Sequence, residues 1–179
     1  MMIYFSKKRF FAILLISIGL ISSKNINAQS IFSCKVDGKT FEGKIQDASL
    51  VMLNKEKFIQ IQVAGGDKIM YLYLQVSKIK GIPAELKYYE RDETKKTSPE
   101  SEIIWVPDGP DNPQWNAVEG KTFVEQFDKE KKLISGTFAF KIEKFEYTSD
   151  ETKKRPSMEV TDGKFTNITY KIDASAQGK

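Results

Sequence analysis

Apolar and polar side chains alternate one by one along much of this chain, and this period of two constrains its fold more than any other feature. Ile59, Ile61 and Val63 share one parity, and glutamines stand between them. The segment 133–142 places apolar residues or glycine at every second position. Because successive side chains of a strand point to opposite faces, the pattern predicts β-strands. We expect no long amphipathic helix, and at most a short one at 116–119 or 128–132.

Glycine and aspartate mark the turns between these strands. Asp37-Gly38 joins two short alternating runs, which is a strong hairpin signal, and Gly65-Gly66-Asp67 joins two longer ones. Val36-Asp37-Gly38-Lys39-Thr40-Phe41 is echoed at 118–123 and again at Asp162-Gly163. We interpret these similar segments as three hairpin turns that each need glycine for the same backbone conformation. The alternative is an internal duplication whose sequence similarity has largely been lost. The prediction is an all-β domain, an antiparallel β-sandwich or barrel-like meander of roughly 8–10 short strands.

Two almost wholly polar stretches interrupt the pattern at 90–102 and 148–157. We expect both to be solvated loops, because charge runs between apolar segments are usually solvent-facing. The apolar parity also changes near Glu143-Lys144, which predicts a bulge or bend there.

The first 28 residues have the layout of a secretory signal peptide. Lys7, Lys8 and Arg9 precede an apolar run that ends at Ile21, and small residues lead to Ala28. The run is shorter than the roughly 20 residues that a spanning helix needs, so cleavage after Ala28 is favoured over an uncleaved anchor. We expect one β domain over 29–172, a flexible tail at 173–179, and a product that is periplasmic, secreted or associated with the cell envelope, without a transmembrane span.

Removal of this segment changes the charge of the protein. Residues 1–28 carry four of the 28 basic residues and none of the 24 acidic ones, so the rest of the chain is formally neutral. The basic footprint of a nucleic-acid-binding protein is therefore missing. With no histidine and one cysteine, His-dependent nucleophile pairs, imidazole zinc sites and an internal disulfide are excluded.

Three further motifs are Cys34-Lys35-Val36-Asp37-Gly38-Lys39-Thr40-Phe41, Ile134-Ser135-Gly136-Thr137-Phe138-Ala139-Phe140 and Val160-Thr161-Asp162-Gly163-Lys164-Phe165-Thr166-Asn167-Ile168. Together they resemble the motifs of a family of small exported bacterial envelope proteins, many of them lipid-anchored, whose domain has no assigned function. The resemblance implies a β-rich exported domain and supplies no catalytic residue. Ile31-Phe32-Ser33-Cys34 is too far from the apolar run for a lipid-attachment box, so Cys34 is expected to be an inward strand residue.

Aromatic residues are the candidate ligand-binding side chains. They are Tyr71, Tyr73, Tyr88, Trp105 and Trp115, with Tyr89 beside them. They could form a platform for sugar rings or for a hydrophobic partner; the alternative is that most are core residues or cross-strand pairs. Trp115 is the one expected to be exposed, because its neighbours are typical of loops.

Asp108, Asp111 and Asn112 are a candidate calcium site. Calcium prefers such oxygen ligands, but the spacing is not that of an EF-hand, and these residues beside glycine and proline are also turn formers. We expect no cofactor. The carboxylate pairs Glu42/Asp47 and Glu125/Asp128 are too weak a signal to predict a hydrolase.

The leading expectation is therefore a non-catalytic exported binding or interaction domain, for an envelope protein, a glycan or a small molecule. A calycin-like carrier of a small apolar ligand is the second hypothesis, and a carboxylate-based hydrolase is the third. A carrier needs an internal cavity, whereas the interior of a sandwich is packed.

Overall fold

The computed structural model describes residues 29–90, 98–109, 112–145 and 154–177. Across these residues, eleven strands belong to a single sheet, and two 3-10 helices are present, η1 (Val76–Lys78) and η2 (Ala174–Ala176). The strands are β1 (Ile31–Val36), β2 (Lys39–Glu42), β3 (Lys44–Leu53), β4 (Glu56–Gly65), β5 (Lys68–Gln75), β6 (Ala84–Lys87), β7 (Ser101–Val106), β8 (Trp115–Asp128), β9 (Leu133–Lys144), β10 (Ser157–Thr169) and β11 (Lys171–Ile172).

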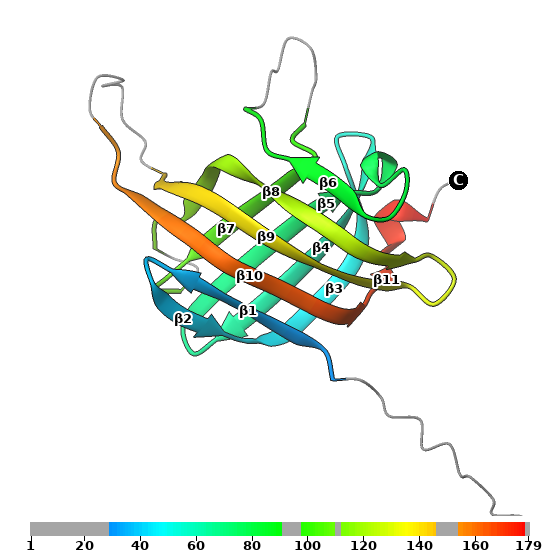
Figure 1. Ribbon diagram of the computed structural model, residues 1–179, viewed down its shortest axis with the longest axis horizontal. Coiled ribbons are helices and arrows are strands. Elements are labelled where there is room, and N and C mark those ends of the chain that lie inside the picture. The colour runs from blue at the N-terminus through cyan, green and yellow to red at the C-terminus, as the bar shows by residue number, and fades with distance from the viewer. Residues whose placement is uncertain (1–28, 91–97, 110–111, 146–153, 178–179) are drawn as a thin grey trace, which may run out of the picture.

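The sheet curls into a half-barrel. Its strand order is β11-β3-β4-β5-β7-β8-β9-β10-β1-β2, with β6 paired to β8 outside this path. Figure 1 shows β8, β9, β10, β1 and β2 as a front layer whose strands cross those of β3, β4, β5 and β7 behind it. The all-β prediction is confirmed. The sheet is mixed rather than purely antiparallel, because β11 runs parallel to β3.

A glycine joins the two ends of the curled sheet. Gly43 is the single residue between β2, which pairs with β1, and β3, which pairs with β4. A Cβ atom on Gly43 would overlap the Val63 side chain, and one on Gly65 would overlap the Phe41 ring. Glycine at these two positions lets the β2–β3 segment pass close to β4, so the chain turns from one layer into the other.

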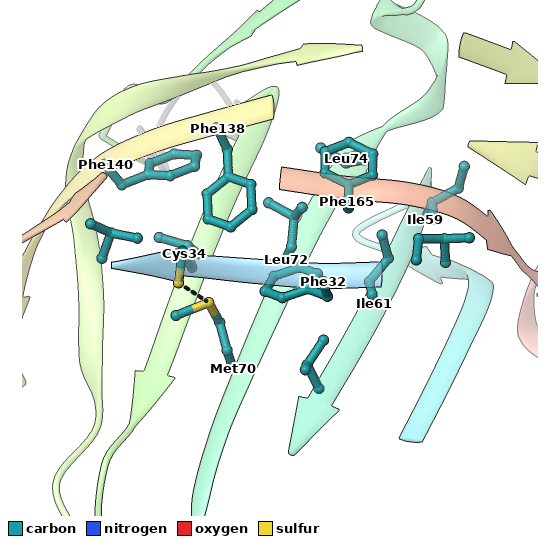
Figure 2. Packing of buried hydrophobic residues seen from close by; sticks show 14 of the residues in the cluster. Phe32, Cys34, Ile59, Ile61, Met70, Leu72, Leu74, Phe138, Phe140 and Phe165 are labelled. Atoms are coloured by element: carbon teal, nitrogen blue, oxygen red, sulfur yellow. Dashed lines mark hydrogen bonds between the residues drawn. The ribbon is translucent and has the colours of Figure 1, made fainter. Parts of the chain in front are cut away.

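The hydrophobic core fills the space inside the curl (Figure 2). The Phe32 and Phe138 ring centroids lie 5.3 Å apart, and Phe41 meets Trp105 edge-on at 4.8 Å. Cys34 is 2% exposed, as expected for an inward strand residue, and its Sγ lies 3.8 Å from the Met70 sulfur. Burial raises the pKa of the Cys34 thiol to about 12, so the thiol is protonated at neutral pH.

The two predicted tight hairpins are confirmed. Asp37 and Gly38 both have positive φ, 49° and 74°, and connect β1 to β2. Gly66, at φ 68°, and Asp67 connect β4 to β5. Such turns need residues that tolerate the left-handed region, which is why Asp-Gly and Gly-Asp sequences predict them well.

The hairpin turns predicted at 118–123 and at Asp162-Gly163 are not present, so that prediction is wrong. Asp162-Gly163 lies inside β10, and Glu119-Gly120 lies inside β8. The strand pairing shifts register between Val160 and Gly163 and between Ala117 and Glu119. Each bulge contains or adjoins a residue of positive φ, Asp162 at 52° and Gly120 at 141°. Asp and Gly favour positive φ in turns and in bulges alike, so the sequence signal is shared by both structures.

Two further expectations differ from the structure. Residues 116–119 belong to β8 and 129–132 form a turn, so neither of the short helices considered is present. Residues 101–102, expected within a polar loop, begin β7. The change of parity near Glu143-Lys144 coincides with the end of β9.

Residues 173–177, the described part of the expected tail, lie against β3. The Asp173 N–H donates to the Leu50 carbonyl oxygen (3.0 Å), and the Met52 N–H donates to Ser175 Oγ (3.2 Å). Ala176 is 2% exposed. The expected signal peptide lies outside the described residues. None of the helices in the described ranges is long and apolar enough to cross a membrane.

Candidate functional site

The predicted aromatic residues do not form a single platform, because the strand register divides them between the two faces of the sheet. Trp105 pairs with Met70 and is only 4% exposed inside the curl. Trp115 pairs with Trp105 and is half-buried against the core, so its expected exposure is wrong. Tyr88 is also half-buried against the core. Tyr71 and Tyr73 point outward, since their neighbours Met70, Leu72 and Leu74 fill the inside.

These two tyrosines lie at the centre of an outer surface that crosses β4, β5 and β7. Gln62 pairs with Tyr71, which pairs with Ile104. In the next row, Gln60 pairs with Tyr73, which pairs with Glu102. We call this surface the tyrosine face; it consists of Gln60, Gln62, Tyr71, Tyr73, Glu102 and Ile104.

The geometry of the tyrosine face combines stacked rings with hydrogen-bonding groups. The Tyr71 and Tyr73 ring centroids are 6.4 Å apart and their planes differ by 20°. All six side chains are partly accessible. Because a strand places alternate residues on one face, two tyrosines separated by one residue stand side by side and the paired glutamines line up beside them. The sequence predicted the two tyrosines as candidate ligand-binding residues, whereas Gln60, Gln62, Glu102 and Ile104 were not recognised as part of a site.

A hollow of about 240 Å³ opens at one end of the tyrosine face. Tyr73, Glu102 and Ile104 belong to both. Leu53 and Asn54, at the turn after β3, form one side. The hollow is also lined by Phe58 of β4 and by the buried Ser98 and Pro99, which precede β7. The hollow therefore joins apolar carbon surface with hydroxyl, amide and carboxylate groups.

Hydrogen-bond acceptors without partners gather on the same side of the sheet. Within the part of the chain that the structure describes, three buried side-chain oxygens have no hydrogen-bond partner: Glu56 Oε2, Gln75 Oε1 and Asn116 Oδ1. Glu56 shares the outward parity of Gln60 on β4, Gln75 shares that of Tyr73 on β5, and Asn116 pairs with Ile104. Buried polar atoms are usually paired, so this side of the sheet has an excess of acceptors.

Two ion pairs border the tyrosine face. Lys171 Nζ lies 2.6 Å from Asp47 Oδ1, and Ser49 Oγ also donates to the Asp47 carboxylate. These hydrogen bonds, the one from Lys171 above all, hold the pKa of Asp47 below its ordinary value. On the other side, Glu100 lies 3.2 Å from Lys78 Nζ and raises the pKa of that lysine.

The outer surface of the front layer is different in character. Its charges pair with one another, as in Lys35–Asp162 at 2.8 Å and Lys121–Glu85 at 3.1 Å. Lys121 also lies over the ring of Phe123, 4.8 Å from its centroid. A hollow of about 340 Å³ beside Phe123 is lined by the charged residues Lys121, Asp162 and Lys164 and by Thr137, Ala139 and Gly163 among others. Mixed charges that satisfy one another are typical of a solvated surface.

The predicted calcium ligands are arranged as a turn where the structure describes them. Asn112 Nδ2 donates to the Asp108 carbonyl oxygen at 2.6 Å, and both residues are exposed. Asp111 lies outside the described residues. No group of three or more Cys, Asp or Glu residues suited to a metal ion occurs among the residues described.

The two carboxylate pairs considered for hydrolysis include residues with structural partners. Asp47 is bound to Lys171 and Ser49, as described above. Asp128 Oδ1 accepts from the Lys131 N–H at 2.9 Å in the turn between β8 and β9, and this bond lowers the pKa of Asp128. These contacts account for both aspartates without a catalytic role.

The tyrosine face and the adjoining hollow are thus the part of the described surface where rings, amides and a carboxylate converge. Comparison with models of known protein families, with curated proteins and with solved structures finds no match for this chain.

Proposed function

We propose that this chain is an exported, non-catalytic binding domain and that the tyrosine face is its ligand-binding surface. The observation that carries the proposal is the stacked pair Tyr71 and Tyr73, flanked by Gln60 and Gln62 on the outer side of the sheet, away from the hydrophobic core. Large rings on the outer side of a sheet are not needed to fill the interior. Accessible aromatic rings beside polar groups are typical of recognition surfaces.

Export rests on the signal-like arrangement of residues 1–28. The resemblance to small exported envelope proteins agrees with it. A cell-envelope location would bring the tyrosine face into contact with envelope proteins, glycans or small molecules.

Ring contacts inside the curl favour a surface-binding role over that of an apolar-ligand carrier. Phe32 of β1 contacts Phe138 of β9, with centroids 5.3 Å apart, and Phe41 of β2 contacts Trp105 of β7 at 4.8 Å. A carrier of this architecture would hold its ligand in that space. Hydrolysis is supported less, because Asp47 and Asp128 already bind a lysine and a backbone amide.

The proposal is tested by affinity capture from the envelope of the source cells, with mass spectrometry of bound proteins and small molecules. We expect the wild-type protein to retain a specific component that the double variant Tyr71→Ala/Tyr73→Ala loses. Phe123→Ala is the matched control, since Phe123 is an accessible aromatic residue on the other layer, 37% exposed.

Retention of the same component by the double variant would show that the tyrosine face is not the binding surface. A small apolar molecule that co-purifies equally with all three proteins would instead support the carrier hypothesis.

A further inference from the structure

We infer that the hollow beside Tyr73 is a sugar-binding subsite that accepts one ring of a neutral glycan, and that the glycan continues over Tyr71 along the tyrosine face. This inference rests on the proposed function and specifies its ligand class. It follows from the size of the hollow, from the chemistry of its lining and from the direction of the adjoining surface.

The size of the hollow suits a single small ring. Its volume of about 240 Å³ is below the roughly 300–1,000 Å³ that is usual for pockets that take drug-sized ligands. A lipid tail or an extended peptide would exceed it. Tyr73 lines the hollow and its ring is stacked at 6.4 Å on that of Tyr71, so a ligand with further units can extend along the stacked rings.

The lining has the two kinds of surface that a sugar ring needs. Phe58, Ile104 and Leu53 offer apolar carbon for the C–H face of the ring, and the tyrosine rings continue that surface. Asn54 and Glu102 offer an amide and a carboxylate for its hydroxyl groups. An ionised carboxylate only accepts hydrogen bonds, so Glu102 selects a ligand with O–H or N–H donors.

Charge narrows the ligand class further. Glu102 is the charged residue among the described residues that line the hollow. A sugar that carries a carboxylate would place a like charge beside Glu102. The neighbouring Gln60 and Gln62 are uncharged donors and acceptors, which suits the hydroxyl groups of a neutral glycan.

The inference is tested by isothermal titration calorimetry of the purified protein with neutral hexamers of glucose and of N-acetylglucosamine, and with a galacturonate hexamer. We expect binding of at least one neutral hexamer and weaker binding of the acidic one. Glu102→Gln, which keeps the size of the side chain, should lower the affinity about tenfold, or about 1.4 kcal/mol. Glu159→Gln, an exposed carboxylate on β10, is the matched control and should leave the affinity unchanged.

Tyr73→Ala is the second variant, with its melting temperature measured beside that of the wild type. Loss of neutral-glycan binding by a folded Tyr73→Ala protein supports the inference. Failure of every neutral hexamer to bind at millimolar concentration, preference for the acidic hexamer, or equal effects of Glu102→Gln and Glu159→Gln would overturn it. If the glycans fail while the double tyrosine variant still loses its envelope component, the proposed function stands and the ligand is of another class.

Discussion

Glycines on the inner side of the front layer stand opposite phenylalanine rings of neighbouring strands. A Cβ on Gly136 would overlap the Phe165 ring, and one on Gly163 would overlap the Phe138 ring. Since both rings are at most 3% exposed, the missing side chains provide the space in which the rings lie. The alternation of the sequence placed Gly136 on the buried face, but not the ring that covers it.

Gly136→Ala is therefore expected to lower the free energy of unfolding by about 1–3 kcal/mol, because the added methyl group overpacks the core. The measurement is urea denaturation. Gly81→Ala is the matched control, since a Cβ there meets nothing within 4 Å. Its free energy of unfolding should stay unchanged or rise by up to about 1 kcal/mol. Equal stability of the Gly136→Ala protein and the wild type would contradict the packing described.

At the scale of the element, the alternation of apolar and polar residues predicted which segments are strands, but it did not predict which strands pair. The alternating pattern predicted most strands, including the side of β5 on which Tyr71 and Tyr73 lie. It could not show that Glu102 lies beside Tyr73, because that contact depends on how β7 pairs with β5. For the same reason the sequence did not show that residues 173–177 lie against β3, since that contact depends on short β11 pairing in parallel with it.

The contact of the C-terminal segment with β3 is expected to weaken in acid. The pKa of Asp47 is lowered mainly by its hydrogen bond with Lys171, and that of Asp173 by its hydrogen bonds with Ser175. A carboxyl whose pKa is lowered on folding stabilises the folded state fully above its unfolded pKa of about 3.9, and this stabilisation is lost as the pH falls through the lowered pKa. The hydrogen-exchange protection of the Met52 amide, which donates to Ser175 Oγ, should fall over this range.

Asp47→Asn should remove part of that acid dependence and leave protection lower at neutral pH. Asp128→Asn, in the distant β8–β9 turn, alters another carboxyl of lowered pKa and should not affect Met52. An identical pH profile of Met52 protection in wild type and Asp47→Asn would mean that the Asp47–Lys171 pair does not hold the segment.

At the scale of the whole molecule, the two layers are joined by the β2–β3 corner and by contacts across the core. Phe41, just before the corner, packs edge-on against Trp105 of the opposite layer, and Cys34 of β1 contacts Met70 of β5. Both layers therefore share one core, and we expect them to unfold together.

Phe41→Ala is expected to lower the free energy of unfolding by about 3–5 kcal/mol, through the lost burial and the cavity left beside Trp105. Tryptophan fluorescence and far-ultraviolet circular dichroism should report the same denaturation midpoint, shifted together. Phe123→Ala, at an accessible position, should shift the midpoint little. A shift seen by fluorescence alone would show that the corner unfolds separately from the rest of the sheet.

The sequence by itself determined that the described domain is all-β, which residues share a face along β4, β5 and β9, and where the Asp37-Gly38 and Gly66-Asp67 hairpins lie, because these depend on neighbours along the chain. Only the tertiary structure decided whether Gly120 and Gly163 form turns or bulges, how the sheet curls at Gly43, and which aromatic residues remain at the surface. Those features depend on contacts between residues far apart in sequence. The tyrosine face depends on both. Its two tyrosines lie on one side of β5 because side chains alternate along a strand, whereas its glutamines, Glu102 and Ile104 lie beside them because β4 and β7 pair with β5.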